Sequence, residues 1–411
     1  MIRNFTRLLS FSSLAMLCTF AFQAYATHVL TPAEYGVLAR WLTDLNYFGL
    51  FLVFGLDNAI LYYSKDPKSY SENIVRNLSV FVGIGLILVL GAFIGGWLTG
   101  YVLCLIVSMV LFASYQSMNA YNQLNEMHTR YGGFVLLRPL LLLIALIGLS
   151  VSSAGGLTAN QVITSYCFVG LALVLVVGWA TLIRSGIRWP KAVVKKDYVV
   201  YGGKSMFNTL LAISLYTSTV YCLDYILGKE AVAYFFVASA VAKLVWVLPD
   251  AVGNVMYPRF LRINRHYTRA AVMEDAYRLS RIVVVLNILA VLVFLIAGRW
   301  FISFIFGDEF VDGAYPVIAI LLIGNQGMVL YKILGRYLAS MDDWRPMHVA
   351  LGMSVAANVL LNFWLAPSHG VVGSAIATSI AFWVCGSIVA LRVPGSFHGF
   401  FSMHKLFKDF R

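Results

Sequence analysis

The feature that most constrains this chain is a succession of long apolar segments separated by short stretches rich in glycine, proline or charged residues. A helix needs about 20 apolar residues to cross the hydrocarbon core of a bilayer. Of the 411 residues, 60% are hydrophobic. Only 12% are charged, whereas soluble domains carry roughly 25% charged residues. The sequence therefore predicts an all-α polytopic membrane protein.

Segment length and hydropathy predict about twelve transmembrane helices. Their approximate limits are 8–28, 36–62, 75–97, 101–123, 132–152, 160–183, 199–227, 231–257, 281–305, 314–337, 346–366 and 370–392. The first segment also resembles a secretory signal, because Arg3 and Arg7 precede the apolar run and Ala24-Tyr25-Ala26 resembles a cleavage site. An uncleaved first helix is favoured, since apolar character continues through Leu30.

The distribution of charge orients the predicted helices. The chain has 30 Lys and Arg residues. Only Arg40, Lys229 and Arg299 are predicted to lie toward the side opposite the termini. Since cytoplasmic loops of membrane proteins are enriched in Lys and Arg, both termini are predicted to be cytoplasmic. Nucleic acid is not an expected partner, because no basic stripe is interleaved with exposed aromatic residues.

A basic connection from Arg184 to Lys204 lies near the middle of the chain. It predicts two six-helix lobes, 1–190 and 191–411, the second ending in a short basic cytoplasmic tail. Six-helix halves of the same orientation are related by a pseudo-two-fold axis along the membrane normal. A central cavity between the lobes is therefore expected.

Short motifs recur near the predicted helix ends. They are LTPAEYG at 30–36, FGLDNAI at 54–60, DYILG at 224–228 with AY at 233–234, FGDEF at 306–310, NVLLNFWLAP at 358–367 and GVVGSAIAT at 370–378. In order and spacing they resemble the polysaccharide, or O-antigen, flippase family. This family is a branch of the multidrug, oligosaccharidyl-lipid and polysaccharide exporter superfamily.

The resemblance implies a transporter that works by alternating access in the bacterial plasma (inner) membrane. Its cargo would be an oligosaccharide on a polyprenyl diphosphate, moved from the inner to the outer leaflet for surface polysaccharide synthesis. Lipid-linked oligosaccharide and membrane lipids are the expected partners, with polysaccharide polymerase and chain-length machinery as further candidates. The chain departs from this pattern in having few intramembrane arginines.

An anionic diphosphate in a low-dielectric cavity needs fixed cations. Lys243 is the first candidate, because it is predicted near the middle of the helix 231–257. The alternative is an ion pair with Asp250, which lies seven residues on and on roughly the same helical face. Lys332 and Arg336 are spaced i and i+4 and form a second cationic face, unless they extend to the membrane interface.

Arg40 and Asp44 also share a helical face, either as a gate that opens with the cavity or as a local ion pair. The carboxylates Asp57, Asp224 and Asp250 lie near predicted membrane boundaries and are candidates for coupling to a proton or sodium gradient. The resemblance favours a structural role for Asp57 and Asp224. No catalytic residue and no metal site are expected.

Three further sets of residues are weighed. Arg138-Pro139 and Arg345-Pro346 are predicted to mark the starts of helices at the cytoplasmic interface. Aromatic rings could face sugar at four positions, Tyr115, Tyr121, Tyr216 and Tyr221. The five cysteines fall within apolar runs without paired spacing, so neither a disulfide framework nor a zinc site is expected.

Two other functions are alternatives to a flippase. An ion-coupled multidrug exporter of the same superfamily would carry cationic cargo, which the central Lys243 disfavours. A membrane-embedded glycan enzyme would need a reaction site, but the outer loops are short and His28 and His369 lack nearby carboxylates or nucleophiles in the sequence. The loops also contain no Gly-rich nucleotide cradle, so no cofactor is expected.

Overall fold

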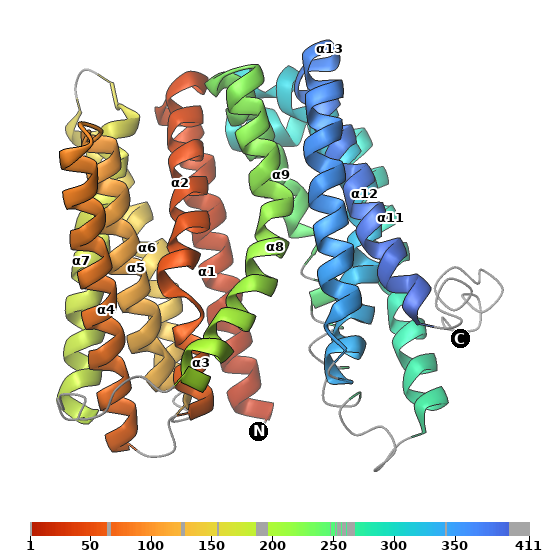
Figure 1. Ribbon diagram of the computed structural model, residues 1–411. Helices are drawn as coiled ribbons and strands as arrows, with labels where there is room; N and C mark the ends of the chain where they lie inside the picture. The colour runs from red at the N-terminus through yellow and green to blue at the C-terminus, as the bar shows by residue number, and fades with distance from the viewer. Residues whose placement is uncertain are drawn as a thin grey trace. The chain divides into compact units, whose positions relative to one another are not determined.

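The computed structural model describes residues 2–63, 67–124, 128–153, 156–185, 196–246, 248–250, 268–341 and 343–393, together with Val252, Met256 and Phe260. These residues are almost entirely helical, and no strand occurs among them (Figure 1). The chain divides into two compact units, unit 1 (Met1–Leu210) and unit 2 (Leu211–Arg411). The predicted boundary at 190/191 lies outside the described residues and stays a prediction.

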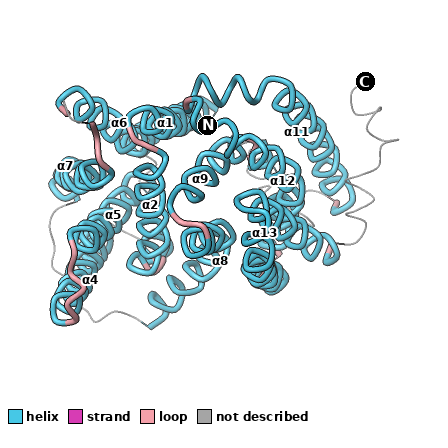
Figure 2. The backbone as a smooth tube through the Cα atoms, turned by 90° about the horizontal axis from the view of Figure 1, so that it is seen from above, coloured by secondary structure: helices cyan, strands magenta, loops and turns pink. Residues whose placement is uncertain are grey.

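Unit 1 is a bundle built around α5. Its helices are α1 (Ile2–Val29), α2 (Pro32–Val53), α3 (Leu56–Tyr63), α4 (Pro67–Ile94), α5 (Gly100–Leu124), α6 (His128–Ser152), α7 (Ala159–Ser185) and the first part of α8 (Lys196–Ile226). Helix α5 packs against α2, α4 and α7, while α1 lies along α6 (Figure 2).

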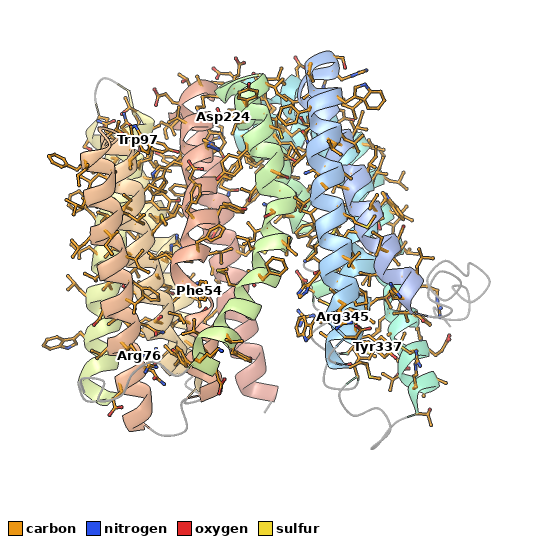
Figure 3. The ribbon with its side chains drawn as sticks, viewed as in Figure 1. Phe54, Arg76, Trp97, Asp224, Tyr337 and Arg345 are labelled. Atoms are coloured by element: carbon orange, nitrogen blue, oxygen red, sulfur yellow. The ribbon has the colours of Figure 1, made fainter. Side chains whose placement is uncertain are left out.

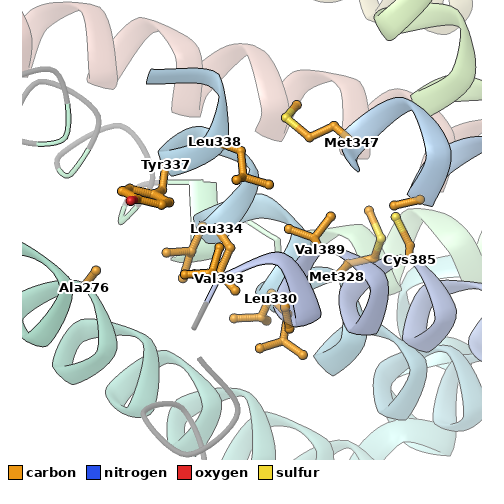
Figure 4. Close-up of a cluster of buried hydrophobic side chains, with 14 of the residues drawn as sticks. Ala276, Met328, Leu330, Leu334, Tyr337, Leu338, Met347, Cys385, Val389 and Val393 are labelled. Atoms are coloured by element: carbon orange, nitrogen blue, oxygen red, sulfur yellow. The ribbon is translucent and has the colours of Figure 1, made fainter. Parts of the chain in front are cut away.

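Unit 2 is built around α12. Its helices are the second part of α8, α9 (Lys229–Leu244), α11 (Arg269–Phe306), the short 3₁₀ helix η1 (Asp308–Phe310), α12 (Val311–Ser340) and α13 (Arg345–Arg392). Helix α12 packs most extensively against α13 and also against α9 and α11. Side chains from α11, α12 and α13 form a buried hydrophobic cluster that includes Ala276, Leu334 and Val389 (Figure 4).

Eight segments of the described chain are long and apolar enough to cross a membrane. They are Glu72–Ile94, Gly100–Asn119, Arg130–Ser152, Ala159–Trp179, Thr209–Ile226, Arg269–Phe306, Asp308–Ser340 and Arg345–Arg392. The last contains two predicted helices, which meet at Gly370, where φ is 60° and ψ is −145°. The prediction of an all-α polytopic membrane protein is confirmed.

The predicted helix 36–62 is wrong in one respect, because it is broken into α2 and α3. Phe54 and Gly55 both have positive φ, of 49° and 65°. A Cβ on Gly55 would collide with the carbonyl of Gly202 on α8, so the break allows a close backbone approach within unit 1. At its other end α2 starts with Thr31, whose hydroxyl accepts a hydrogen bond from Glu34 N at 3.3 Å.

The predicted helix 231–257 is also corrected. Helix α9 ends at Leu244, so Lys243 lies at its C-terminal end rather than at the middle of a continuous helix. The chain tightens there, with Trp246 N donating to Lys243 O at 3.0 Å. Pro249 follows and has no N–H to continue a regular ladder of hydrogen bonds.

The two Arg-Pro predictions have different outcomes. Arg345 begins α13 with Pro346 in its first turn, so this predicted helix start is confirmed. The prediction for Arg138 is wrong, since α6 begins earlier, at His128, and contains Pro139 within it. Arg138 therefore lies well inside a helix.

A neutral polar network joins α8 to α13 within unit 2. Asn358 Nδ2 donates to Leu215 O at 2.7 Å and to Thr219 Oγ1 at 2.8 Å. Thr219 and Thr378 share a hydroxyl hydrogen bond of 2.9 Å, and Asn362 Nδ2 donates to Asn358 Oδ1 at 2.9 Å. We call Asn358, Asn362, Thr219 and Thr378 the amide–hydroxyl network. All four side chains are fully buried, so these hydrogen bonds satisfy polar groups that lipid could not satisfy.

Candidate functional site

Three aromatic side chains from separate parts of unit 2 form the base of the candidate site. Tyr216 lies on α8, Trp246 follows α9, and Phe382 lies on α13. The ring centroids are 5.2 Å apart for Tyr216 and Trp246, 5.0 Å for Tyr216 and Phe382, and 6.0 Å for Trp246 and Phe382. These spacings fall within the range of favourable aromatic contacts.

Two lysines lie against these rings. Lys243 Nζ is 4.5 Å from the centroid of Tyr216, and Lys332 Nζ is 4.3 Å from that of Trp246. A cation over an aromatic face gains about 2 kcal/mol when desolvated. Lys332 also binds Asp250 at 2.6 Å. We call Lys243, Lys332, Asp250, Tyr216 and Trp246 the lysine–aromatic cluster.

The prediction that Lys243 has Asp250 as its alternative partner is wrong. Asp250 binds Lys332 on α12 instead, because the end of α9 at Leu244 removes the continuous helical face that would align residues 243 and 250. Within the described chain, no carboxylate lies within 4 Å of the Lys243 ammonium group. Among the described residues, this partly buried cation is therefore compensated by the ring face of Tyr216.

The lysine–aromatic cluster also contains unused hydrogen-bonding capacity. The hydroxyl of Tyr216 and the indole Nε1 of Trp246 are buried and have no hydrogen-bond partner among the described residues. With two ammonium groups and one carboxylate, the cluster carries a formal charge of 2 − 1 = +1. An anion with several acceptor oxygens would satisfy both the charge and the donors.

The local fold positions these groups through α12. Asn325 Nδ2 donates to Ala242 O at 2.7 Å, which fixes the end of α9 immediately before Lys243. Glycines bring α12 close to α13, since a Cβ on Gly327 would lie 2.7 Å from the carbonyl carbon of Phe382. Lys332 lies on the same helix and reaches the chain beyond α9 at Asp250.

Within the described chain, no ion pair links the remaining predicted cations, Arg336 and Arg40, to the lysine–aromatic cluster. Arg336 is one turn beyond Lys332 on α12 and makes no ion pair within the described chain. In unit 1, Arg40 and Asp44 form an ion pair of 3.5 Å, as the local alternative predicted. Tyr101 donates a further hydrogen bond to Asp44 at 2.7 Å. Whether this pair acts as a gate stays a prediction.

The other predicted carboxylates lie near helix ends. Asp57 is in the first turn of α3, where a negative charge interacts favourably with the helix dipole. Asp224 lies near the end of α8 and binds Lys229 at 2.6 Å (Figure 3). Both positions agree with a structural role for Asp57 and Asp224. Coupling of either residue to an ion stays a prediction.

Sequence reasoning missed Trp246, Phe382 and Asn325 as parts of the site. Tyr216 was considered only as one of four tyrosines that could face sugar. When a whole segment is apolar, its sequence does not show which indole or amide side chain will be buried at a site. The available signal was Trp246-Val247-Leu248-Pro249, which places an aromatic residue and a proline directly after a lysine-bearing helix.

Comparison with known proteins places these features in a family context. Residues 27–314 match the family described as "Polysaccharide biosynthesis protein". A relative from Haloferax volcanii, "Probable low-salt glycan biosynthesis flippase Agl15", is 23% identical over 236 residues. That match spans 56% of this chain and 48% of the relative, so it covers about half of the relative's length.

Solved structures share the fold at low sequence identity. "Lipid II flippase MurJ, inward closed conformation" has a TM-score of 0.74 at 13% identity, covering 100% of this chain and 92% of the neighbour. A multidrug resistance MATE family transporter of the MOP superfamily, in an inward-facing conformation, has a TM-score of 0.66 at 12% identity. That alignment covers 96% of each chain. The relative and these neighbours are described as flippases and a transporter rather than as enzymes.

Proposed function

This chain belongs to the family of polysaccharide biosynthesis proteins, and from that membership we propose that it is a flippase for a lipid-linked oligosaccharide. The carrier lipid is a polyprenyl diphosphate, and transport runs from the inner to the outer leaflet by alternating access. The product serves surface polysaccharide synthesis of the O-antigen type. The proposed location is the bacterial inner membrane, with both termini in the cytoplasm.

The observation that carries this proposal is the lysine–aromatic cluster. It offers two ammonium groups, a phenol hydroxyl and an indole N–H, and its formal charge is positive. A diphosphate presents several acceptor oxygens to such donors.

An ion-coupled multidrug exporter is the alternative within the superfamily. Likeness to a MATE transporter at 12% identity concerns the fold and leaves cargo open. Cationic cargo needs a negative site, whereas the lysine–aromatic cluster is positive. Raised resistance to cationic dyes on expression, with surface polysaccharide unchanged on deletion, would reverse this preference.

The proposal is tested by measuring lipid-linked oligosaccharide in each leaflet of cells that lack this protein. Accumulation in the inner leaflet is expected, together with loss of surface polysaccharide. Absence of accumulation, with surface polysaccharide intact, would contradict the flippase proposal.

A single substitution then tests the cluster. Lys243→Gln should lower surface polysaccharide by about tenfold or more, because a hydrogen bond to a charged group contributes about 1.5–3 kcal/mol. Lys243→Arg should retain part of the activity. Arg299→Gln is the matched control, since Arg299 forms an exposed pair with Asp312, which is not among the candidate coupling residues. Normal surface polysaccharide from the Lys243→Gln protein would remove this lysine from the mechanism.

The driving force and partners are further parts of the proposal. No nucleotide cradle was found in the sequence, so a proton or sodium gradient, or the membrane potential, would supply the energy. The carboxylates Asp44, Asp57, Asp224 and Asp250 are the candidates for coupling. Polysaccharide polymerase and chain-length machinery are the proposed protein partners, acting on the flipped product.

A further inference from the structure

Two cysteines of unit 1 meet where α5 packs against α7. Cys104 lies on α5 one turn after its start at Gly100, and Cys167 lies on α7. The thiol of Cys167 donates to the backbone carbonyl of Cys104 at 3.5 Å, and the two side chains also interact with each other. No spacing in the sequence pairs these residues, so tertiary packing alone brings them together.

The two helices approach closely enough here for a covalent link. Ser108 Oγ on α5 is 3.3 Å from Cys167 Sγ on α7. One turn further along both helices, a Cβ on Gly170 would lie 3.4 Å from the Cβ of Leu111. The Cβ atoms of a disulfide are about 3.5–4.5 Å apart. The missing side chain of Gly170 therefore allows the helix spacing that a bond between Cys104 and Cys167 requires.

Neither thiol is enclosed by the protein. Cys104 and Cys167 are half-buried, whereas Cys222 and Cys385 are buried. The Ser108 hydroxyl lies against the sulfur of Cys167 and is able to donate to it in the thiolate form. Because the thiolate is the form that attacks a disulfide, this contact favours Cys167 as the first cysteine to react.

These observations point to a chemical modification. We propose that Cys104 and Cys167 form a reversible disulfide between α5 and α7 when a small disulfide-containing oxidant reaches them. In the proposed orientation α5 begins at the outer surface of the bacterial inner membrane, which is the oxidising side. The inference goes beyond the proposed function, because it requires neither transport nor cargo.

The reaction is a double thiol–disulfide exchange. The Cys167 thiolate attacks one sulfur of the oxidant, whose S–S bond breaks so that one thiolate leaves with the electron pair. The Cys104 thiolate then attacks Cys167 Sγ and displaces the second thiolate. The two cysteines are oxidised, and the oxidant is reduced to two thiols that take up the protons the cysteines lose.

The test uses the purified full-length protein in detergent, first reduced and then treated with dithiodipyridine, a small uncharged disulfide. Remaining thiols are alkylated, and the peptides are analysed by mass spectrometry without reduction. Peptides linked through Cys104 and Cys167 of the same chain are expected. Cysteines that stay free at these positions, that keep a thiopyridyl group, or that link two chains would overturn the proposal.

The other cysteines and two variants control the assignment. Cys104→Ser and Cys167→Ser should each abolish the linked peptides. Cys18 is the internal control, because it is half-buried in the same unit and has no thiol contact among the described residues. Cys18 should be absent from every linked peptide, and a link from it to either cysteine would overturn the assignment.

A measurement of stability tests whether the bond fits the native packing. Oxidation should raise the thermal midpoint of the wild-type protein, because a bond that closes a long loop restricts the unfolded chain. Cys104→Ser should show no such rise. This comparison of oxidised and reduced wild-type protein holds even where a variant does not fold. An unchanged or lower midpoint on oxidation would contradict a native disulfide between α5 and α7.

Discussion

At the scale of single residues, the chemistry of unit 2 depends on which lysine has a carboxylate. Lys332 is paired with Asp250 at 2.6 Å, whereas Lys243 relies on the ring of Tyr216. The two lysines therefore differ in role although both lie in one cluster. Lys332 holds the chain beyond α9 in place, whereas Lys243 has no carboxylate partner within the described chain.

This difference predicts opposite effects of removing Asp250 on stability and on anion binding. Asp250→Asn should lower thermal stability by on the order of 1 kcal/mol, because Asp250 is 44% exposed and the pair is partly screened. The same substitution should strengthen binding of a diphosphate lipid by raising the formal charge of the cluster from +1 to +2.

The double variant Asp250→Asn with Lys332→Met supplies the check on the pair. Its thermal midpoint in detergent should fall by less than the sum of the two single effects, because the second substitution removes a lysine that the first left unpaired. Additive shifts would show that the pair contributes nothing as a pair.

At the scale of elements, the packing of α12 against α13 depends on glycines. A Cβ on Gly327 would meet the carbonyl of Phe382, and one on Gly386 would meet the carbonyl of Gly327. Such close contact between helix backbones is a common means of association in membranes, where lipid removes the hydrophobic driving force. Phe382 also belongs to the base of the candidate site, so this packing supports the lysine–aromatic cluster directly.

Gly327→Ala should therefore destabilise unit 2, with a cost of about 1–3 kcal/mol from overpacking. Gly352→Ala is the matched control, because a Cβ at Gly352 on α13 meets nothing within 4 Å. It should be neutral or raise stability by up to about 1 kcal/mol through helix propensity. The comparison is made on thermal midpoints of the purified proteins, and equal midpoints for the two variants would contradict the packing argument.

At the scale of the whole molecule, the number of spans sets the sides on which loops and termini lie. Each of the twelve predicted spans contains helical residues among those that the structure describes. The predicted helix 36–62 is interrupted, and α9 is shorter than the predicted helix 231–257. An even number of crossings returns the chain to its starting side. The excess of Lys and Arg on that side predicts that it is the cytoplasm.

Reporter fusions test this arrangement in cells. Green fluorescent protein fused after Arg411 should fluoresce, and alkaline phosphatase inserted after Trp97, between α4 and α5, should be active. The exchanged fusions should both be inactive, which controls for expression. Alkaline phosphatase activity at Arg411 would contradict the cytoplasmic assignment of the C terminus.

The sequence predicted most of the long helices because bilayer thickness imposes a length that hydropathy reveals directly. It placed the start of α2 four residues too late, at 36, although Thr31, Pro32 and Glu34 carry a local signal for a helix start. It missed the break at Phe54 and Gly55, because the reason for that break is Gly202 on a distant helix. The partner of Lys332 was likewise invisible, since Asp250 meets it only through tertiary packing.

The amide–hydroxyl network of α8 and α13 has a consequence for energy coupling. Its four side chains are two amides and two alcohols, none of which gains or loses a proton in the physiological range. It carries no net charge, so a membrane voltage exerts no net force on it. One elementary charge moved through 100 mV gains about 2.3 kcal/mol, and the network has none to move. In this unit, a membrane voltage therefore acts on charged side chains such as Lys243, Lys332 and Asp250, and not on the amide–hydroxyl network.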